Sequence, residues 1–149
     1  RGEVNDAVVA RFLQHPHFFR MAPKSLDRDA FAALAGEVAT LSDADAAATL
    51  TACAAASVMR GMELCPAPPE RLLVTGGGRR NPVMMAMIAA GCDCPVLPVE
   101  EAGLDGDMLE AQAFAYLAMR SLRGLPLTFP ATTGAPHPLT GGRLDTAIL

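Results

Sequence analysis

The sequence predicts an α/β fold in which helices come first and a strand–helix–strand–helix segment follows. Residues 1–70 carry apolar and small side chains at helical spacing, and from Arg71 two short apolar runs alternate with two helical patterns. A βαβα order implies parallel strands, and parallel sheets are normally covered on both faces. Because two such strands alone make a poor sheet, the pattern also indicates that the first strands of the sheet lie outside this sequence.

Two helices are expected in the N-terminal part of the chain. Asn5 is placed to cap the first helix, which ends before Pro16 because the residue before a proline disfavours helical geometry. A second helix is expected to begin at Ser25 or Asp27 and to carry Phe31. A loop is expected between these two helices.

A third and longer helix is expected from Ser42. Asp45 follows three residues later, which resembles a capping box with Asp in place of Glu. The body of this helix is rich in Ala, Thr, Cys and Ser, and such small side chains let another element approach closely. The proline-rich segment 66–69 then forms a stiff connector.

The second half of the chain supplies the predicted strands. Leu72–Val74 is a short apolar run that ends at three glycines, and Asn81 and Pro82 are placed as the N-cap and first residue of a helix that stops near Gly91. Residues 95–99 form a second apolar run, and residues 100–106 an acidic loop. The last helix is expected over about 107–123.

The expected organisation is one domain over residues 1–149. It consists of a helical segment over 1–70, a βαβα nucleotide-binding segment over 71–123 and a tail over 124–149. The tail is rich in Pro, Gly and Thr, so we expect it to be mostly loop.

Composition and charge limit the classes of partner. The chain has 149 residues, of which 51% are hydrophobic, and a formal net charge of -4 at pH 7. An acidic chain is a poor match for a nucleic-acid backbone, so we expect no nucleic-acid partner. The longest uncharged helical run, Ala46–Met59, is shorter than the ~20 residues that span a bilayer, so we expect no membrane span.

The cysteines bear on the cellular compartment. Cys53, Cys65, Cys92 and Cys94 form no CxxC pair and show no zinc-ligand spacing. They fit free thiols in a reducing cytoplasm, and two disulfides are the alternative. The first residues do not resemble a secretory signal. The expected localisation is therefore cytoplasmic.

The strongest local signal for chemistry is the glycine-rich turn after the first strand. Gly76, Gly77 and Gly78 let the backbone turn sharply and let a ligand approach without interference from a Cβ atom. The following helix N-terminus would offer free N–H groups, and Arg79 and Arg80 add positive charge nearby. Together these features suit a nucleotide, although they do not match the Walker pattern. A tight β–α turn without a ligand remains the alternative.

A second signal is Glu110, which shares one face of the last helix with Phe114 and Leu117. A carboxylate on an apolar face in the first turn of a helix could serve a polar substrate. Asp107 and Glu110 also have the spacing of a capping box, which would stabilise the helix without binding anything. The two roles do not exclude each other.

The order of the motifs resembles that of the anhydro-N-acetylmuramic acid kinase family over nearly the whole chain. The motifs that carry this resemblance are Pro23-Lys24-Ser25 with Asp29-Ala30-Phe31, Ala48-Thr49-Leu50-Thr51, Gly76-Gly77-Gly78-Arg79-Arg80-Asn81, Glu110-Ala111-Gln112-Ala113-Phe114-Ala115 and Thr133-Gly134-Ala135. Leu26-Asp27 departs from the Thr-Gly usual after the first motif. Lys24 is open to two interpretations, a phosphate contact or a solvated loop charge.

The resemblance implies a fold and a reaction. The fold is the actin-like, ribonuclease H-like ATPase fold, of which this chain would be the C-terminal part of the second domain. The reaction is ATP-dependent phosphorylation of 1,6-anhydro-N-acetylmuramic acid with ring opening by water, which gives N-acetylmuramic acid 6-phosphate during peptidoglycan recycling. The alternative from another class is a non-catalytic actin-like or Hsp70-like nucleotide-binding module.

The resemblance also implies roles for residues and partners. Gly76, Gly77 and Gly78 would bind the nucleotide, Asn81 would cap the helix behind them, and Glu110 would be the carboxylate at the sugar site. The expected cofactors are ATP and Mg²⁺, with the Mg²⁺ ligands outside this chain. The family's catalytic aspartate lies in an Asp-Thr-Gly-Pro motif that this sequence lacks. The expected partners are the N-terminal part of the same protein and, as one alternative, a second copy in a homodimer.

Overall fold

The computed structural model describes residues 2–143 and residue 145, which form two compact units. Unit 1 contains the residues up to Arg20 together with Leu26–Gly106. Unit 2 contains Met21–Ser25 and the residues from Asp107 onward. Each unit is described by itself below.

Unit 1 begins with short helices. Helix α1 spans Asp6–Phe12, and Asn5 caps it as predicted, because its side chain accepts a hydrogen bond from the N–H of Val8 at 3.1 Å. A 3₁₀ helix follows over Pro16–Phe19. The predicted second helix is divided in two, a 3₁₀ helix over Arg28–Phe31 capped by Asp27 and helix α2 over Ala33–Val38.

Helix α3 spans Asp43–Met62 and starts at the predicted cap, Ser42. The Ser42 hydroxyl accepts from the N–H of Asp45 at 3.2 Å and donates to the Asp45 carboxylate at 2.8 Å. The second carboxylate oxygen accepts from the N–H of Glu3 at 2.7 Å. The capping box is therefore modified. In the usual form a Glu carboxylate accepts from the backbone N–H of the cap residue, whereas the Asp45 carboxylate accepts from the backbone N–H of Glu3. The Glu3 N–H and then the Ser42 hydroxyl lower the pKa of Asp45.

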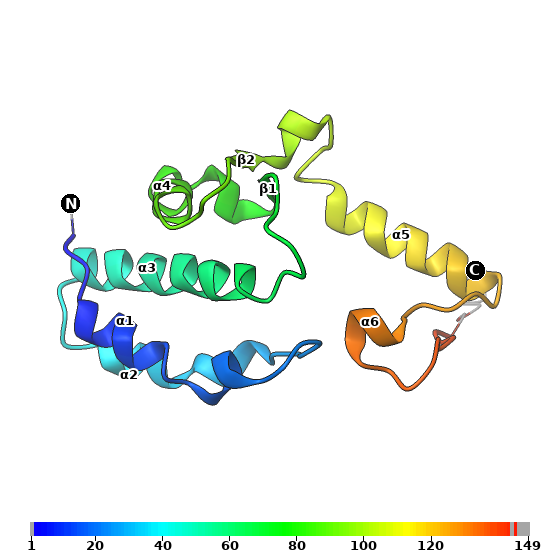
Figure 1. The fold of residues 1–149 in the computed structure, drawn as a ribbon, viewed down its shortest axis with the longest axis horizontal. Coiled ribbons are helices and arrows are strands. Elements are labelled where there is room, and N and C mark those ends of the chain that lie inside the picture. The colour runs from blue at the N-terminus through cyan, green and yellow to red at the C-terminus, as the bar shows by residue number, and fades with distance from the viewer. Residues whose placement is uncertain (1, 144, 146–149) are drawn as a thin grey trace. The chain divides into compact units, whose positions relative to one another are not determined.

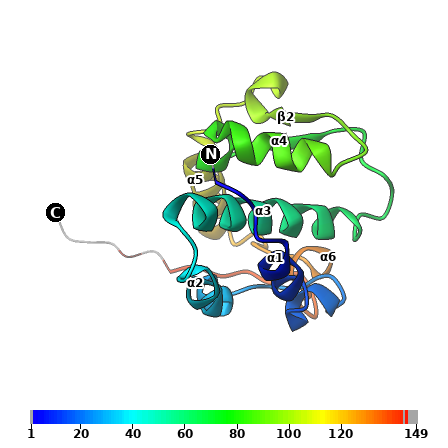
Figure 2. The same cartoon turned by 90° about the vertical axis from the view of Figure 1, so that its left-hand side faces the viewer.

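Small side chains of α3 form the middle of unit 1. Thr49, Cys53, Ala55 and Ala56 are buried, which confirms that this helix allows close approach. Helices α1 and α2 pack on one side of α3, and helix α4, over Pro82–Ala90, packs on the other (Figures 1 and 2). Burial raises the pKa of the Cys53 thiol.

The sheet of the described residues has two parallel strands, as the βαβ pattern predicts. Strand β1 spans Leu72–Val74 and strand β2 spans Val96–Pro98, with Leu72 opposite Val96 and Val74 opposite Pro98. Helix α4 connects the strands and lies between the sheet and α3 (Figure 2). The sequence of α4 contains no charged residue, as expected for a helix with neighbours on two sides.

Three further details differ from the sequence predictions. Residues Val99–Ala102 form a 3₁₀ turn at the start of the expected acidic loop. The expected capping box of Asp107 and Glu110 is wrong, because helix α5 spans Leu109–Leu122 and its N-cap is Met108, which makes no side-chain cap hydrogen bond. A short helix α6 over Pro130–Thr133 interrupts the tail, whose other described residues are mostly loop as predicted; residues 144 and 146–149 lie outside the described residues.

Two further observations concern the described residues only. No helix among them has the length and apolar character needed to cross a membrane. The four cysteines are free thiols, of which Cys53 is buried and Cys65 is exposed.

Candidate functional site

The glycine turn directly follows β1. Gly76 has φ 73° and ψ −176°, a conformation that is essentially restricted to glycine, and Gly77 begins a 3₁₀ helix that ends at Arg80. A Cβ atom on Gly76 or Gly77 would have no atom within 4 Å, whereas one on Gly78 would lie 3.1 Å from the sulfur of Met84. The backbone of the first two glycines is therefore open to a ligand.

Asn81 caps α4, as the sequence predicts. Its side-chain oxygen accepts hydrogen bonds from the N–H groups of Val83 at 3.0 Å and Met84 at 3.1 Å. Pro82 is the first helical residue and has no N–H to satisfy. The sequence led us to expect free N–H groups at this helix end, and that expectation is wrong for the two donors that Asn81 binds.

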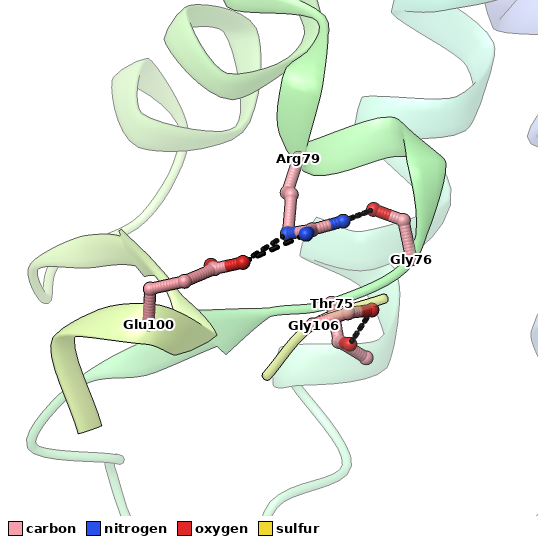
Figure 3. A network of polar contacts seen from close by, with 5 residues as sticks. All are labelled: Thr75, Gly76, Arg79, Glu100 and Gly106. Atoms are coloured by element: carbon pink, nitrogen blue, oxygen red, sulfur yellow. Dashed lines mark hydrogen bonds and ion pairs between the residues drawn. The ribbon is translucent and has the colours of Figure 1, made fainter. Parts of the chain in front are cut away.

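Arg79 joins the turn to the loop that follows β2 (Figure 3). Its Nε and Nη2 atoms lie 2.8 and 2.7 Å from one carboxylate oxygen of Glu100, and Nη1 donates to the Gly76 carbonyl at 2.9 Å. The Arg79 side chain is only 6% exposed. The sequence suggested that this charge would face a nucleotide, but the structure pairs it with Glu100.

The same network includes the end of unit 1. A Cβ atom on Gly106 would lie 2.6 Å from the Cζ atom of Arg79, so the guanidinium occupies the space that a side chain would need. The Thr75 hydroxyl donates to the Gly106 carbonyl at 3.3 Å (Figure 3). The hydrogen bond from Arg79 holds the pKa of Glu100 below its usual value. This network links residues far apart in sequence, so sequence spacing alone could not reveal it.

Glu110 belongs to unit 2 and lies in the first turn of α5, where it is exposed. Phe114, four residues later on the same helix, is 66% exposed. Glu110 and Phe114 are four residues apart on α5 and therefore share one helix face, as the sequence predicts. It brings Gly76, Gly77, Gly78 and Asn81 together in unit 1, whereas Glu110 lies in unit 2.

Comparison with known proteins identifies the family. The sequence model of the family described as anhydro-N-acetylmuramic acid kinase matches residues 1–146. The chain belongs to this family. The match covers nearly the whole chain, as the resemblance of the motifs predicts. The family is one of kinases.

Curated relatives carry the same description. A protein named anhydro-N-acetylmuramic acid kinase from Cereibacter sphaeroides is 67% identical over 144 residues, which cover 97% of this chain and 39% of the relative. Proteins of that name from Ruegeria sp. and Rhodospirillum rubrum are 59% and 57% identical, and each match covers 95% of this chain. These matches cover 38% of the Ruegeria protein and 37% of the Rhodospirillum protein. The chain therefore spans about two fifths of the length of these kinases.

Two of the motifs that carry the resemblance to the family, Pro23-Lys24-Ser25 and Thr133-Gly134-Ala135, lie close together in unit 2. Gly134 has φ 74°, and a Cβ atom there would lie 3.4 Å from a ring carbon of Pro23 and 3.9 Å from its carbonyl oxygen. The Pro23-Lys24-Ser25 segment therefore lies beside the Thr133-Gly134-Ala135 segment. Sequence reasoning missed this contact, because no periodic pattern connects segments so far apart.

The described residues do not form a metal site of their own. Among them, no group of three or more His, Cys, Asp or Glu side chains could hold a metal ion. Around the glycine turn, the exposed backbone of Gly76 and Gly77 has open space for a ligand.

Proposed function

We propose that the full-length protein containing this chain is an ATP-dependent kinase that converts 1,6-anhydro-N-acetylmuramic acid to N-acetylmuramic acid 6-phosphate. Water opens the anhydro ring in the same reaction, which serves peptidoglycan recycling in the cytoplasm. The observation that carries this proposal is the family match over residues 1–146. The proposed fold is the actin-like one, in which residues 1–149 are the C-terminal part of the second domain.

The proposed nucleotide site uses Gly76, Gly77 and Gly78, with Asn81 fixing the helix behind them. Two features of unit 1 support it: the first two glycines are exposed, and no atom lies within 4 Å of a Cβ position on either. Gly77 begins a 3₁₀ helix, so its N–H has no acceptor within that helix and is suited to an oxygen of the nucleotide. Mg²⁺ bound with ATP would neutralise phosphate charge during transfer.

Glu110 is the proposed carboxylate at the sugar site. Its exposure and its position in the first turn of α5 leave its oxygens accessible to sugar hydroxyls. Glu110→Gln in the full-length kinase keeps the size of the side chain but removes its charge. We expect a loss of kcat/KM for the anhydro sugar with an unchanged KM for ATP. An unchanged sugar kcat/KM would remove Glu110 from the site.

The catalytic aspartate is proposed to lie outside this chain, so the chain alone should be inactive. Phosphoryl transfer depends on positioning and charge stabilisation from both sides of the nucleotide. Loss of the general base alone should lower the rate by about 10²–10⁴-fold. The proposed partners are therefore the remaining part of the protein and the anhydro sugar, and the oligomeric proposal is a homodimer.

Turnover tests the reaction directly. The full-length protein and the 149-residue chain are incubated in parallel with ATP, Mg²⁺ and the anhydro sugar in ¹⁸O-labelled water. We expect ADP and a labelled N-acetylmuramic acid 6-phosphate from the full-length protein only, because the labelled oxygen enters when the ring opens. Comparable turnover by the chain alone would place the catalytic base within residues 1–149.

A substitution tests the nucleotide site. Gly77 has no positive φ and has open space at its Cβ position, so Gly77→Val should fold. Its branched side chain should nevertheless block the approach of ATP and raise the ATP KM. Gly36→Val is the matched control, because Gly36 in α2 has equally open space. An ATP KM equal to that of the Gly36 variant would contradict the proposed site.

A further inference from the structure

Arg79 holds the carbonyl oxygen of Gly76 from two sides. Its Nη1 donates to this oxygen at 2.9 Å (Figure 3). The backbone N–H of Arg79 donates to the same oxygen at 3.3 Å. A carbonyl oxygen has two lone pairs, so these two hydrogen bonds occupy both of its acceptor positions. The orientation of the peptide between Gly76 and Gly77 is therefore set by one residue.

Fixing this oxygen also fixes a donor. The peptide between Gly76 and Gly77 is planar and trans, so the Gly77 N–H points opposite to the Gly76 carbonyl. That direction leads away from the guanidinium of Arg79. The backbone of Gly76 and Gly77 is exposed and open at both Cβ positions, so a ligand oxygen can approach this peptide.

The far side of the Arg79 guanidinium is anchored as well. Glu100 accepts from Nε and Nη2 at 2.8 and 2.7 Å, and Gly106 lies against the Cζ atom where a side chain would collide. The Arg79 charge is thus paired, and its side chain is 6% exposed. A paired and covered guanidinium is poorly placed to contact a phosphate, but it is well placed to hold a backbone segment.

We propose that Arg79 is a positioning residue for the nucleotide, which it does not itself contact. Its guanidinium joins Glu100 to the Gly76 carbonyl and so holds the Gly76–Gly77 peptide in one orientation. This orientation directs the Gly77 N–H toward an oxygen of the bound nucleotide. This inference rests on the proposed function, because it requires that the glycine turn binds ATP.

The test compares two Arg→Lys variants in the full-length kinase. Lysine is a point donor, so Arg79→Lys cannot reproduce the planar fork that joins Gly76 to Glu100. Arg60→Lys is the control for the loss of an arginine ion pair, because Arg60 pairs equally closely with Glu63 at the end of α3, from Nη1 alone to the two carboxylate oxygens at 2.9 and 2.7 Å. Steady-state kinetics and the melting temperature are measured for both variants.

We expect the ATP KM of Arg79→Lys to rise about tenfold, as for the loss of one oriented hydrogen bond. Its KM for the sugar should match that of Arg60→Lys, whereas its melting temperature should be lower, because the Arg79 side chain is 6% exposed and that of Arg60 is 35% exposed. Glu100→Gln should give a smaller rise in the ATP KM, since an amide oxygen still accepts a hydrogen bond from Arg79. A purely structural role would lower the melting temperature without separating the two KM values.

Three outcomes would overturn the inference. The first is an Arg79→Lys variant whose ATP KM equals that of Arg60→Lys. The second is a parallel rise of the ATP and sugar KM values, which indicates general destabilisation. The third is an ATP KM unaffected by Gly77→Val, which removes both the proposed nucleotide site at the turn and this inference. The first two outcomes leave the proposed nucleotide site intact, and none of the three touches the family match on which the proposed kinase reaction rests.

Discussion

The two units differ in how they are stabilised. Among the described residues, every buried apolar side chain belongs to unit 1, including Val8 and Phe12 of α1, Cys53 of α3 and Ile88 of α4. Helix α5 of unit 2 has no buried residue, although its sequence is as apolar as a core helix. Apolar sequence alone therefore does not create a core, because burial requires a second element to pack against.

Unit 2 relies on polar contacts instead. Arg120 donates from Nε to the carbonyl of Pro126 at 2.5 Å and from Nη1 to the Tyr116 hydroxyl at 3.0 Å. The Ser121 hydroxyl donates to the carbonyl of Gly141 at 2.7 Å. Such bonds add little net stability when water competes for the same groups. A helix of 14 residues without buried side chains is marginal in water, so we expect α5 to be less stable than unit 1.

The largest expected effect comes from removing a core side chain of unit 1. Ile88 is 2% exposed, and α4 packs on α3. Ile88→Ala should lower the free energy of unfolding of the chain by about 2–5 kcal/mol, because it loses buried surface and leaves a cavity. Urea denaturation followed by circular dichroism measures the change.

Phe114→Ala in α5 is the matched variant in unit 2. Phe114 is larger than Ile88 but 66% exposed, so its removal should change the free energy of unfolding by no more than about 0.5 kcal/mol. A loss as large as that of Ile88→Ala would show that α5 is buried in solution, and the contrast between the units would fail.

A medium effect is expected from a buried polar contact of unit 1. Thr49 is 0% exposed, and its hydroxyl accepts from the N–H of Asn5 at 3.0 Å and donates to the carbonyl of Asp45 at 2.7 Å. Thr49→Val keeps the shape but leaves the Asn5 N–H without its acceptor. We expect a loss of about 1–3 kcal/mol in the free energy of unfolding.

Two controls separate this contact from a general effect of losing a hydroxyl. Thr51 lies on the same helix and donates only to the carbonyl of Ala47, in an exposed position. Thr51→Val, and Ser121→Ala in unit 2, should each cost no more than about 0.5 kcal/mol. Equal losses in all three variants would mean that the contact between Thr49 and Asn5 contributes nothing specific.

Local chemistry explains which parts of the fold the sequence could predict. Asn5, Ser42 and Asn81 all cap helices as predicted, because capping depends on residues only three positions apart. The βαβ segment was predicted for a similar reason, since glycines and an Asn-Pro pair mark its boundaries. The cap at Asp107 was predicted wrongly, because spacing does not show whether the backbone enters the helix at that residue.

The candidate site was less predictable. The sequence predicted open backbone at Gly76, Gly77 and Gly78 from the residue type, which is correct for the first two, whereas Met84 lies close to the Cβ position of Gly78. The pairing of Arg79 with Glu100 depends on the parallel strands bringing two loops to the same edge of the sheet. Such long-range contacts follow from packing, which a single sequence does not specify. The roles of Glu110 and of the glycines stay predictions.

The smallest expected effect is a pH dependence in unit 1. The hydrogen bond from Arg79 lowers the pKa of Glu100 from 4.5, so the folded state binds this proton less readily than the unfolded chain. The stabilisation is fully present above pH 4.5 and is lost as the pH falls through the lower folded value. Glu100 is 46% exposed and the pair is screened by salt, which keeps the effect small.

Glu100→Gln measures this contribution. The urea midpoint of the chain is followed from about pH 6 to about pH 3, at low and at high salt. We expect the midpoint of the variant to fall less steeply below pH 4.5 than that of the parent chain, and the difference should shrink at high salt. The pKa of Asp45 is also lowered, so the variant keeps some acid sensitivity. Identical pH profiles for the variant and the parent chain would mean that Arg79 and Glu100 do not pair in solution, and the clamp on the glycine turn would lose its anchor.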